Sequence, residues 1–445
     1  MQLDTSYRQI LAISTPIMLG SAVQNVIAAT DVIFLSRLSQ SDLAAIGIVG
    51  AFYLTVAAVG FGFSKGGQIM IARRMGEGKA DEVGKTFYTM VYFELALAVF
   101  MFLFMQYGSL EFFSYFIDAP DILFKCTEYL SYRSWGVFFS YVGVAFVALY
   151  TGVARPTFIV IDTLILALVN FVLNWGLIFG KWGLPEMGIA GAGLASTIAE
   201  VVAFVIFVIY IYFDKEAVKY NLFKLPKIDF DLFKDQQRIA TPIVAQVVVG
   251  MGASFFFLSL VENLGETEAA ITSMVRIVYL VLSIPCWGFA SGVNTLVSNM
   301  IGQNRKDEVM PVIWKTGLLC FGVTLIISFP VIIFPEYVLY PVFGETNMDL
   351  IYDAKYTMYV LYGILLVFAF GGVYFNGLAG TGATFYGLKI QTVCSVLYVA
   401  YIAYAIKYLQ VGLELAWASE IFYWVVIWGL TYVYLRSNKW HGLKV

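Results

Sequence analysis

Long apolar segments dominate this chain and constrain its fold more than any other feature. A helix needs about 20 predominantly apolar residues to cross the hydrocarbon core of a membrane, and twelve segments reach that length. They cover residues 10–33, 45–72, 85–107, 129–153, 157–180, 188–213, 239–261, 270–299, 310–334, 356–380, 387–408 and 412–436. Polar and apolar residues do not alternate in them as they do in barrel strands. The sequence therefore predicts an all-α integral membrane protein with twelve transmembrane helices.

Composition excludes the usual classes of soluble protein. Hydrophobic residues make up 60% of the 445 residues and charged residues 13%, whereas a soluble domain carries about 25% charged residues. A folded form would lack the polar surface that water requires, which excludes a cytosolic enzyme, a secreted domain and a nucleic-acid binder. The four cysteines lie far apart, and the single histidine, His441, is near the C-terminus. We therefore expect no disulfide framework, metal centre or cofactor built on Cys and His.

The distribution of Lys and Arg predicts the orientation of the chain. Most of these residues lie in the loops after the even-numbered spans and in the two termini, and loops rich in Lys and Arg stay in the cytoplasm. Both termini are therefore expected on the cytoplasmic side of the plasma (inner) membrane. The longest charged stretch, 214–238, is predicted to be a cytoplasmic linker between an N-terminal lobe, 1–213, and a C-terminal lobe, 239–445.

The two predicted lobes repeat each other in sequence. The motif TPI at 15–17 recurs at 241–243, and DEV at 81–83 recurs at 307–309, with the same offset and the same place relative to a span. Six spans per lobe keep both lobes in the same orientation, so the repeats are parallel. Transporters built from repeats place substrate and ion sites near the repeat interface. A duplicated twelve-span chain therefore indicates a transporter.

Short motifs in a fixed order resemble those of the multidrug and toxic compound extrusion (MATE) family. The first span carries Pro16, Gln24 and Asp31 with spacings similar to those of that family's first helix. The second span ends in the Gly-rich stretch GFSKGGQIMIARRMGEGKADEV. Spans five and six contain NFVLNWGLIFG and MGIAGAGLAS, which are similar to the family's N-x-x-x-(N/D) and G-x-x-G-A-x-x-A-T patterns. The resemblance covers nearly the whole chain.

The resemblance implies two pseudo-symmetric six-helix bundles and a secondary active antiporter, not an enzyme. Such a protein exports small amphipathic organic cations or drugs in exchange for Na⁺ or H⁺. We expect it to work as a monomer, in contact with membrane lipids and without a cofactor. A flippase for a lipid-linked sugar, from the same wider superfamily, is the alternative. A multi-pass membrane enzyme is less favoured, because the sequence shows neither a catalytic His nor clustered acids at one membrane face.

Acidic side chains within the spans are the first candidates for ion coupling, because a charge at the centre of a membrane helix costs at least about 2.5 kcal/mol. The acids within the predicted spans are Asp31, Glu94, Asp162, Glu200 and Glu420. All but Glu420 lie in the N-terminal lobe. Two positions where some family members carry second-lobe acids align here with Gly250 and Phe368. This asymmetry favours coupling through the N-terminal lobe.

By resemblance, Asp31, Asn170 and Asn174 form the ion-coupling site, and their depth adds Ala192 and Ser196 to it. Counted from the outer ends of their predicted helices, these residues lie at a similar depth. One carboxylate, two amide oxygens, a hydroxyl and a backbone carbonyl would form an oxygen cage for Na⁺ around Asp31, Asn170 and Asn174. The same carboxyl, once desolvated, can carry a proton instead. The absence of a second acid tilts the prediction slightly towards Na⁺. In the alternative interpretation, the two Asn residues only hydrogen-bond between helices.

Further candidates for a cavity or a proton relay are Gln24, Lys65, Glu94 and Glu200. Lys65 and Glu94 are predicted at the same depth on adjacent spans, and therefore as a buried ion pair, with packing alone as the alternative role. Glu200 either serves a cavity or relay or makes a buried hydrogen bond.

Three other residues inside the spans complete the expectations. Pro16 lacks a backbone donor, and the resemblance implies that it is a hinge whose bend is coupled to the charge state of Asp31. Asp162 is expected to reach towards the cytoplasmic surface. The role of Arg276, like that of Glu420, stays open.

Overall fold

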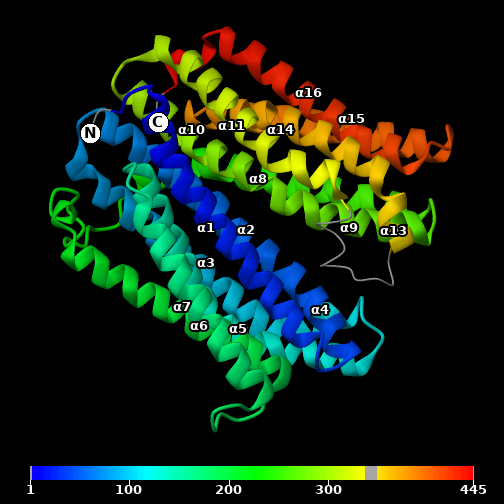
Figure 1. The fold of residues 1–445 in the computed structure, drawn as a ribbon. Helices are drawn as coiled ribbons and strands as arrows, with labels where there is room; N and C mark the ends of the chain where they lie inside the picture. Colours follow the sequence, from blue (N-terminus) through cyan, green and yellow to red (C-terminus); the bar gives the residue numbers. More distant parts are fainter. Residues whose placement is uncertain (1–2, 336–347, 444–445) are drawn as a thin grey trace. The chain divides into compact units, whose positions relative to one another are not determined.

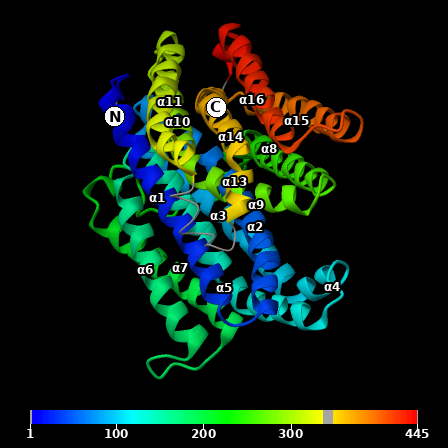
Figure 2. The same ribbon diagram turned by 45° about the vertical axis from the view of Figure 1, so that its right-hand side comes forward.

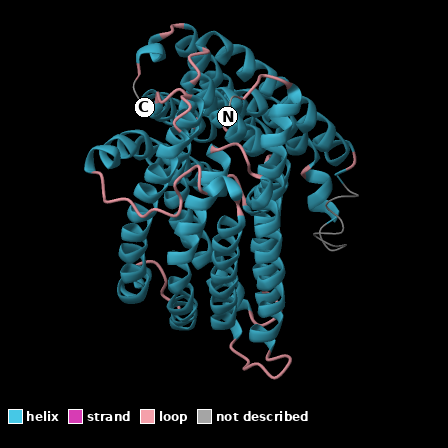
Figure 3. Cartoon of the chain, turned by 90° about the vertical axis from the view of Figure 1, so that its left-hand side faces the viewer, coloured by secondary structure: helices cyan, strands magenta, loops and turns pink. Residues whose placement is uncertain are grey.

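The computed structural model describes residues 3–335 and 348–443, and within these ranges it contains helices, turns and loops but no strand (Figures 1 and 3). Eleven of its helices are long and apolar enough to cross a membrane, and one bent pair of helices meets the same criterion as a single span. The predicted all-α membrane fold with twelve spans is therefore confirmed.

Contacts divide the chain into two compact units, which we call the N-terminal unit (Leu19–Ala240) and the C-terminal unit (Met1–Met18 and Thr241–Val445). The first half of the chain contains α1 (Tyr7–Leu35), α2 (Gln40–Gly76), α3 (Val83–Leu103), α4 (Ser109–Ser114), α5 (Pro120–Gly152), α6 (Thr157–Phe179) and α7 (Gly188–Phe213). The second half contains α8 (Phe230–Glu262), α9 (Glu266–Leu282), α10 (Ile284–Gly302), α11 (Val309–Ile333), α13 (Met348–Asp353), α14 (Lys355–Gly380), α15 (Thr384–Lys407) and α16 (Leu413–Arg436). Short 3-10 or π segments are η1 (Ala80–Glu82), η2 (Phe104–Gly108), η3 (Lys215–Ala217), η4 (Lys306–Glu308) and η6 (Lys439–Gly442).

Each unit is organised around one central helix. In the N-terminal unit α5 packs against α2, α3 and α7, and α6 packs against α7 (Figure 2). In the C-terminal unit α14 packs against α10, α11 and α16, and α15 packs against α16. Because α5 and α14 hold the same place in the two halves of the chain, the internal repeat is also present in the packing of the helices.

Two helices begin in one unit and end in the other. The boundary between the units falls after Met18 in α1 and after Ala240 in α8. Pro16 and Pro242, which are counterparts in the repeat, lie within two residues of these boundaries. Proline removes one backbone hydrogen bond from a helix and is a common cause of bending. Each unit is therefore joined to the other through a helix with a weakened turn at the boundary.

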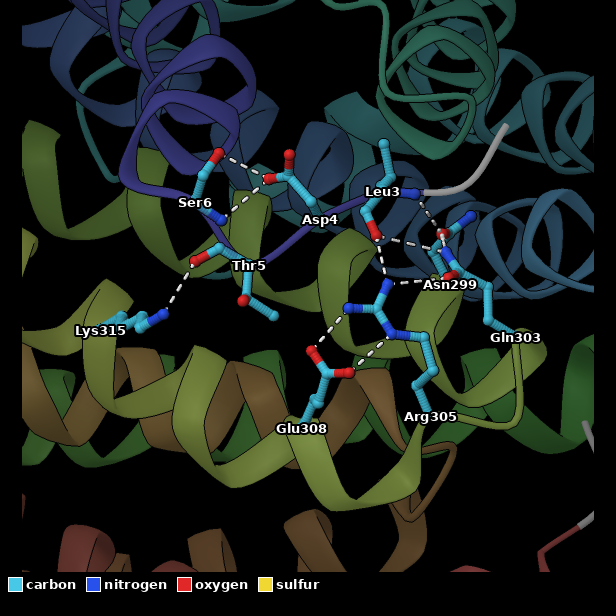
Figure 4. A network of polar contacts seen from close by, with 9 residues as sticks. All are labelled: Leu3, Asp4, Thr5, Ser6, Asn299, Gln303, Arg305, Glu308 and Lys315. Atoms are coloured by element: carbon cyan, nitrogen blue, oxygen red, sulfur yellow. Dashed lines mark hydrogen bonds and ion pairs between the residues drawn. The ribbon is translucent and has the colours of Figure 1, made fainter.

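Polar contacts attach the N-terminal segment to the C-terminal unit (Figure 4). The Arg305 guanidinium donates to the Leu3 carbonyl at 2.8 Å and forms a two-pronged ion pair with Glu308 at 2.8 and 2.6 Å. Lys315 donates to the Thr5 carbonyl at 3.3 Å. The predicted lobes 1–213 and 239–445 follow chain order. The contacts instead group residues 1–18 with the C-terminal unit, because this network and the first turns of α1 pack there.

The charged stretch 214–238 folds back onto the start of α3 within the N-terminal unit. The Gly84 amide donates to the Tyr220 carbonyl at 2.8 Å, and Lys85 pairs with Asp229 at 2.6 Å. The hydrogen bond from Lys85 and those from backbone amides hold the pKa of Asp229 below its usual value. This stretch is thus a structured connection with its own contacts to α3.

Gly84 is required for this close approach, and its replacement provides a stability test. A Cβ at position 84 would collide with the Tyr220 carbonyl oxygen and lie 2.8 Å from that of Asn221. We expect Gly84→Ala to lower the free energy of unfolding by about 1–3 kcal/mol, the usual effect of overpacking. Thermal unfolding of the detergent-purified protein measures the change.

Gly47→Ala is the matched control for this substitution. Gly47 lies inside α2, where an added Cβ meets no atom within 4 Å, so alanine should be neutral or stabilise the helix by about 0.5–1 kcal/mol. Equal losses of stability in the two variants would show that the linker contact at Gly84 contributes nothing.

The span predicted at 270–299 is a bent pair of helices. α9 and α10 meet at Ser283 with a change of direction of 43°. Pro285 lies in the first turn of α10 and has no N–H to continue the hydrogen bonding of α9. The Ser283 hydroxyl donates to the Leu280 carbonyl at 3.1 Å and satisfies one of the carbonyls left free at the bend.

Candidate functional site

Three helices of the N-terminal unit bring the predicted ion-coupling residues together. Asp31 lies one turn before the end of α1. Asn170 and Asn174 are four residues apart on α6, and Ala192 and Ser196 are four residues apart on α7. Residues with this spacing share one face of a helix. The packing of α6 against α7 then turns these two faces towards each other.

A continuous chain of hydrogen bonds joins four of these residues. Asn174 Nδ2 donates to Asp31 Oδ1 at 2.5 Å and to Asn170 Oδ1 at 3.1 Å. Asn170 Nδ2 donates in turn to Ser196 Oγ at 3.0 Å. Asn174 and Asn170 are 0% and 1% exposed, whereas Asp31 is partly exposed. The carboxylate therefore lies at the accessible end of a buried polar chain.

The amide orientation of Asn174 matters for what this cluster can bind. Its Oδ1 is buried and has no hydrogen-bond partner among the described residues, while its Nδ2 faces Asp31. A rotation of the amide by 180° exchanges the two atoms and would direct Oδ1 towards the space beside the carboxylate. In the present orientation the Asn174 amide donates to the Asp31 carboxylate, and in the rotated one it would add an oxygen ligand for a cation.

Apolar groups surround this polar chain. Ala192 is fully buried in a core cluster that also contains Phe34 and Ile178. The Phe34 ring lies 5.3 Å from that of Phe171 and 5.8 Å from that of Trp175. These side chains lower the local dielectric, which strengthens the interaction of a cation with the Asp31 carboxylate.

A buried ion pair lies beside the cluster in the same unit. Arg133 on α5 donates to both carboxylate oxygens of Glu200 on α7, at 2.7 and 2.5 Å, and lies over the Tyr53 ring at 3.8 Å from its centroid. A Cβ on Gly136 would lie 2.5 Å from Glu200 Oε2, so a glycine is needed to make room. Of the two alternatives for Glu200, this geometry favours the buried hydrogen-bonded one.

Arg133 is a buried charged residue that the sequence did not identify as a candidate. α5 begins at Pro120, well before the predicted span 129–153, so Arg133 lies in the interior of the helix instead of its first turn and is 6% exposed. The apolar pattern missed the first turns of α5 because they are amphipathic. An arginine and a glutamate at matching depth on neighbouring apolar segments is the signal that could have identified the pair.

Glu94 is fully buried on α3 and accepts a hydrogen bond from Ser64 at 2.8 Å. Its second oxygen has no hydrogen-bond partner among the described residues. The sequence predicted Lys65, the neighbour of Ser64, as the partner of Glu94. The ion pairs found among the described residues do not include one between Lys65 and Glu94. Adjacent residues on a helix point about 100° apart, so Ser64 takes the place facing Glu94.

Two other residues singled out from the sequence, Gln24 and Asp162, lie in the same unit. Gln24 lies two turns before Asp31 on α1 with an exposed side chain, outside the hydrogen-bonded cluster. Asp162 on α6 was expected to reach the surface, but it is 6% exposed and its Oδ1 lacks a hydrogen-bond partner among the described residues. The prediction for Asp162 is wrong, because the side chain is too short to extend past its packed neighbours.

The C-terminal unit has an aromatic residue at the counterpart of Asp31. Phe257 is 3% exposed, and its ring lies 6.3 Å from that of Tyr398 and 5.3 Å from that of Trp417. Phe368, the second of the positions at which the resemblance led us to look for an acid, is also buried among aromatic rings. Neither of these two positions therefore supplies a carboxylate of the kind that Asp31 provides in the N-terminal unit.

Comparison with known proteins agrees with this architecture. The family model described as MatE matches residues 16–176 and 242–404, one match in each half of the chain. A probable multidrug resistance protein NorM from Neisseria meningitidis serogroup A is 28% identical over 270 residues, which are 59% of this chain and 58% of the relative. A NorM relative from Thermotoga maritima is 23% identical and covers 98% of this chain and 94% of its own length.

Solved structures share the fold. A multidrug resistance MATE family transporter of the MOP superfamily in an outward-facing conformation has a TM-score of 0.89 at 19% identity, covering 97% of this chain and 95% of its own. A MOP superfamily transporter from Pyrococcus furiosus has a TM-score of 0.87 at 19% identity with the same coverage. At this identity the likeness concerns the fold alone.

Proposed function

Because the chain belongs to the MatE family of multi-pass membrane transporters, we propose that it is a secondary active antiporter that exports amphipathic organic cations in exchange for Na⁺ or H⁺. The observation that carries this proposal is the hydrogen-bonded chain from Asp31 through Asn174 and Asn170 to Ser196. It offers one partly exposed carboxylate backed by neutral oxygens, which is the chemistry that reversible binding of a small cation requires.

Coupling would follow from the charge of Asp31. An empty site leaves a carboxylate in an apolar environment, held by the Asn174 amide. A bound Na⁺ or proton removes that net charge and changes the preferred arrangement of α1 against α6. A ligand shifts a conformational equilibrium only by its difference in affinity for the two states. Ion binding at Asp31 would therefore favour the state that releases substrate on the outer side.

Pro16 is proposed as the hinge that transmits this change. It lies in α1 two residues before the boundary between the units, while Asp31 lies on the same helix within the N-terminal unit. A bend at Pro16 would allow the part of α1 that carries Asp31 to move while the first turns stay attached to the C-terminal unit. We further propose a monomer in the plasma membrane with both termini in the cytoplasm.

Efflux from proteoliposomes tests the proposed function. A fluorescent lipophilic cation is loaded, and Na⁺ and pH gradients are imposed separately. We expect efflux driven by at least one of the two inward ion gradients. Absence of cation efflux under both gradients would contradict the proposal and favour a different cargo, such as the lipid-linked sugar of the alternative function.

Sodium binding can be measured without transport. A ligand that binds the native state stabilises it by RT ln(1 + [L]/Kd), or about 2.7 kcal/mol at one hundred times Kd. We expect NaCl to raise the melting temperature of the purified protein more than KCl at equal ionic strength. Asn174→Ala should abolish the difference, because it removes the amide that contacts Asp31.

Asn263→Ala is the matched control for the sodium measurement. Asn263 is exposed just beyond the end of α8 in the C-terminal unit, and its amide donates to the Ser259 carbonyl, so the sodium effect should persist. If Na⁺ and K⁺ act alike on the wild type while a pH gradient alone drives efflux, the coupling ion is the proton.

A further inference from the structure

The C-terminal unit contains an intramembrane acid that the proposed coupling mechanism does not use. Glu420 lies on α16 two turns after its first residue, Leu413, which corresponds to about 10 Å along the helix axis. It is partly buried. An ionisable side chain at such a depth is costly and marks a functional site by default.

The carboxylate of Glu420 has weak partners within the protein. Tyr398 Oη on α15 donates to Glu420 Oε1 at 3.5 Å, which is at the long limit for a hydrogen bond. Glu420 takes part in none of the ion pairs found among the described residues. Arg276 on α9 interacts with it electrostatically, but its side chain is exposed. The negative charge is therefore only partly compensated.

Aromatic rings form the surroundings of this carboxylate. The Tyr398 ring lies 5.2 Å from that of Tyr423, which in turn lies 5.3 Å from that of Trp424. Tyr279 on α9 interacts with the same carboxylate. Gln391 donates to the Tyr423 hydroxyl at 2.7 Å and holds that ring in place. Three helices, α9, α15 and α16, thus contribute aromatic side chains or their supports around one acid.

The chemistry of this cluster differs from that of the Asp31 cluster. Asp31 is backed by two amides and a hydroxyl, which suit a small hard cation. Glu420 is backed by tyrosine and tryptophan rings, whose faces attract large, weakly hydrated organic cations. Phe257, the repeat counterpart of Asp31, packs against Tyr398 and adds apolar surface where the other unit has its polar chain.

We propose that Glu420, with Tyr279, Tyr398 and Tyr423, binds the charged group of an organic cation, and that Arg276 competes with this cation for the carboxylate. The proposal rests on the proposed export of organic cations and assigns their charged group to the C-terminal unit. Coupling ion and substrate are then bound by different units. Arg276 partly offsets the charge of Glu420 and repels a cation bound there, so its removal strengthens substrate binding.

Equilibrium binding of radiolabelled tetraphenylphosphonium to the full-length protein in detergent tests this site. We expect Glu420→Gln to weaken binding by about tenfold or more, the effect of removing one partner of a desolvated charge pair. Arg276→Gln should tighten binding. Glu414→Gln is the matched control, because Glu414 lies on the same helix nearly two turns away and should leave the affinity unchanged.

The melting temperature of the purified variant, compared with that of the wild type, serves as a check that Glu420→Gln is folded. Wild-type affinity in Glu420→Gln, weaker binding in Arg276→Gln, or no binding of the probe by the wild type would overturn the proposal. These outcomes are independent of transport. Gradient-driven efflux with normal binding in Glu420→Gln would refute this site alone, whereas Glu420-dependent binding without efflux would refute the antiporter.

Discussion

Asp31→Asn is expected to reduce gradient-driven efflux to the passive leak of the proteoliposomes. The substitution removes the only carboxylate of the hydrogen-bonded cluster, so that neither Na⁺ nor a proton can be bound and released there. The protein should still fold, because an asparagine oxygen can accept the hydrogen bond that Asn174 donates to Asp31. Removal of this partly buried negative charge also removes the free-energy cost of desolvating it.

The measurement compares initial efflux rates under imposed Na⁺ and pH gradients, with melting temperature as the check on folding. Asp121→Asn is the matched control, because Asp121 is in the same unit but its side chain is 66% exposed at the start of α5. Its efflux rate should equal that of the wild type. Efflux at the wild-type rate in Asp31→Asn would show that coupling occurs elsewhere, with Glu94 as the next acid to test.

The Arg133–Glu200 pair is expected to give the largest single effects on stability. Both side chains are largely buried, with exposures of 8% and 13%. Removal of one partner leaves an uncompensated charge in the unit, which costs about 3–5 kcal/mol. We expect this loss for Glu200→Leu and for Arg133→Met, and a much smaller loss for the double variant, in which no charge is left behind.

A double-mutant cycle on the free energy of unfolding measures this coupling. The exposed pair of Lys219 and Glu216, with side-chain exposures of 56% and 49%, is the control and should contribute about 1 kcal/mol or less. Additive losses at Arg133 and Glu200 would mean that the two side chains do not depend on each other in the folded protein.

Local helix geometry explains why much of the candidate site was predictable. Asn170 and Asn174 lie four residues apart, as do Ala192 and Ser196, and this spacing puts each pair on one helix face whatever the tertiary packing. The depth of Asp31 followed from the length of its apolar segment. The role of these residues in ion coupling stays a prediction, while their assembly into one cluster is a property of the fold.

Other partners could not be predicted from spacing. Arg133 and Glu200 are 67 residues apart in sequence, and only the packing of α5 against α7 brings them together. The choice of Ser64 instead of Lys65 as the donor to Glu94 depends on the rotation of α2 about its axis. A rotation of one residue changes which side chain faces α3, and hydropathy alone does not determine it in a helix that is apolar on all sides.

The sequence by itself determined the environment, the number of spans and the internal repeat, because a bilayer requires long apolar helices whose backbone groups are satisfied within each segment. Only the tertiary structure decided which unit holds residues 1–18, where the span after α8 bends, and which charged side chains pair. These features depend on contacts between segments that are distant in sequence. Such contacts are determined by how the side chains of neighbouring helices fit together, which the pattern within a single helix does not contain.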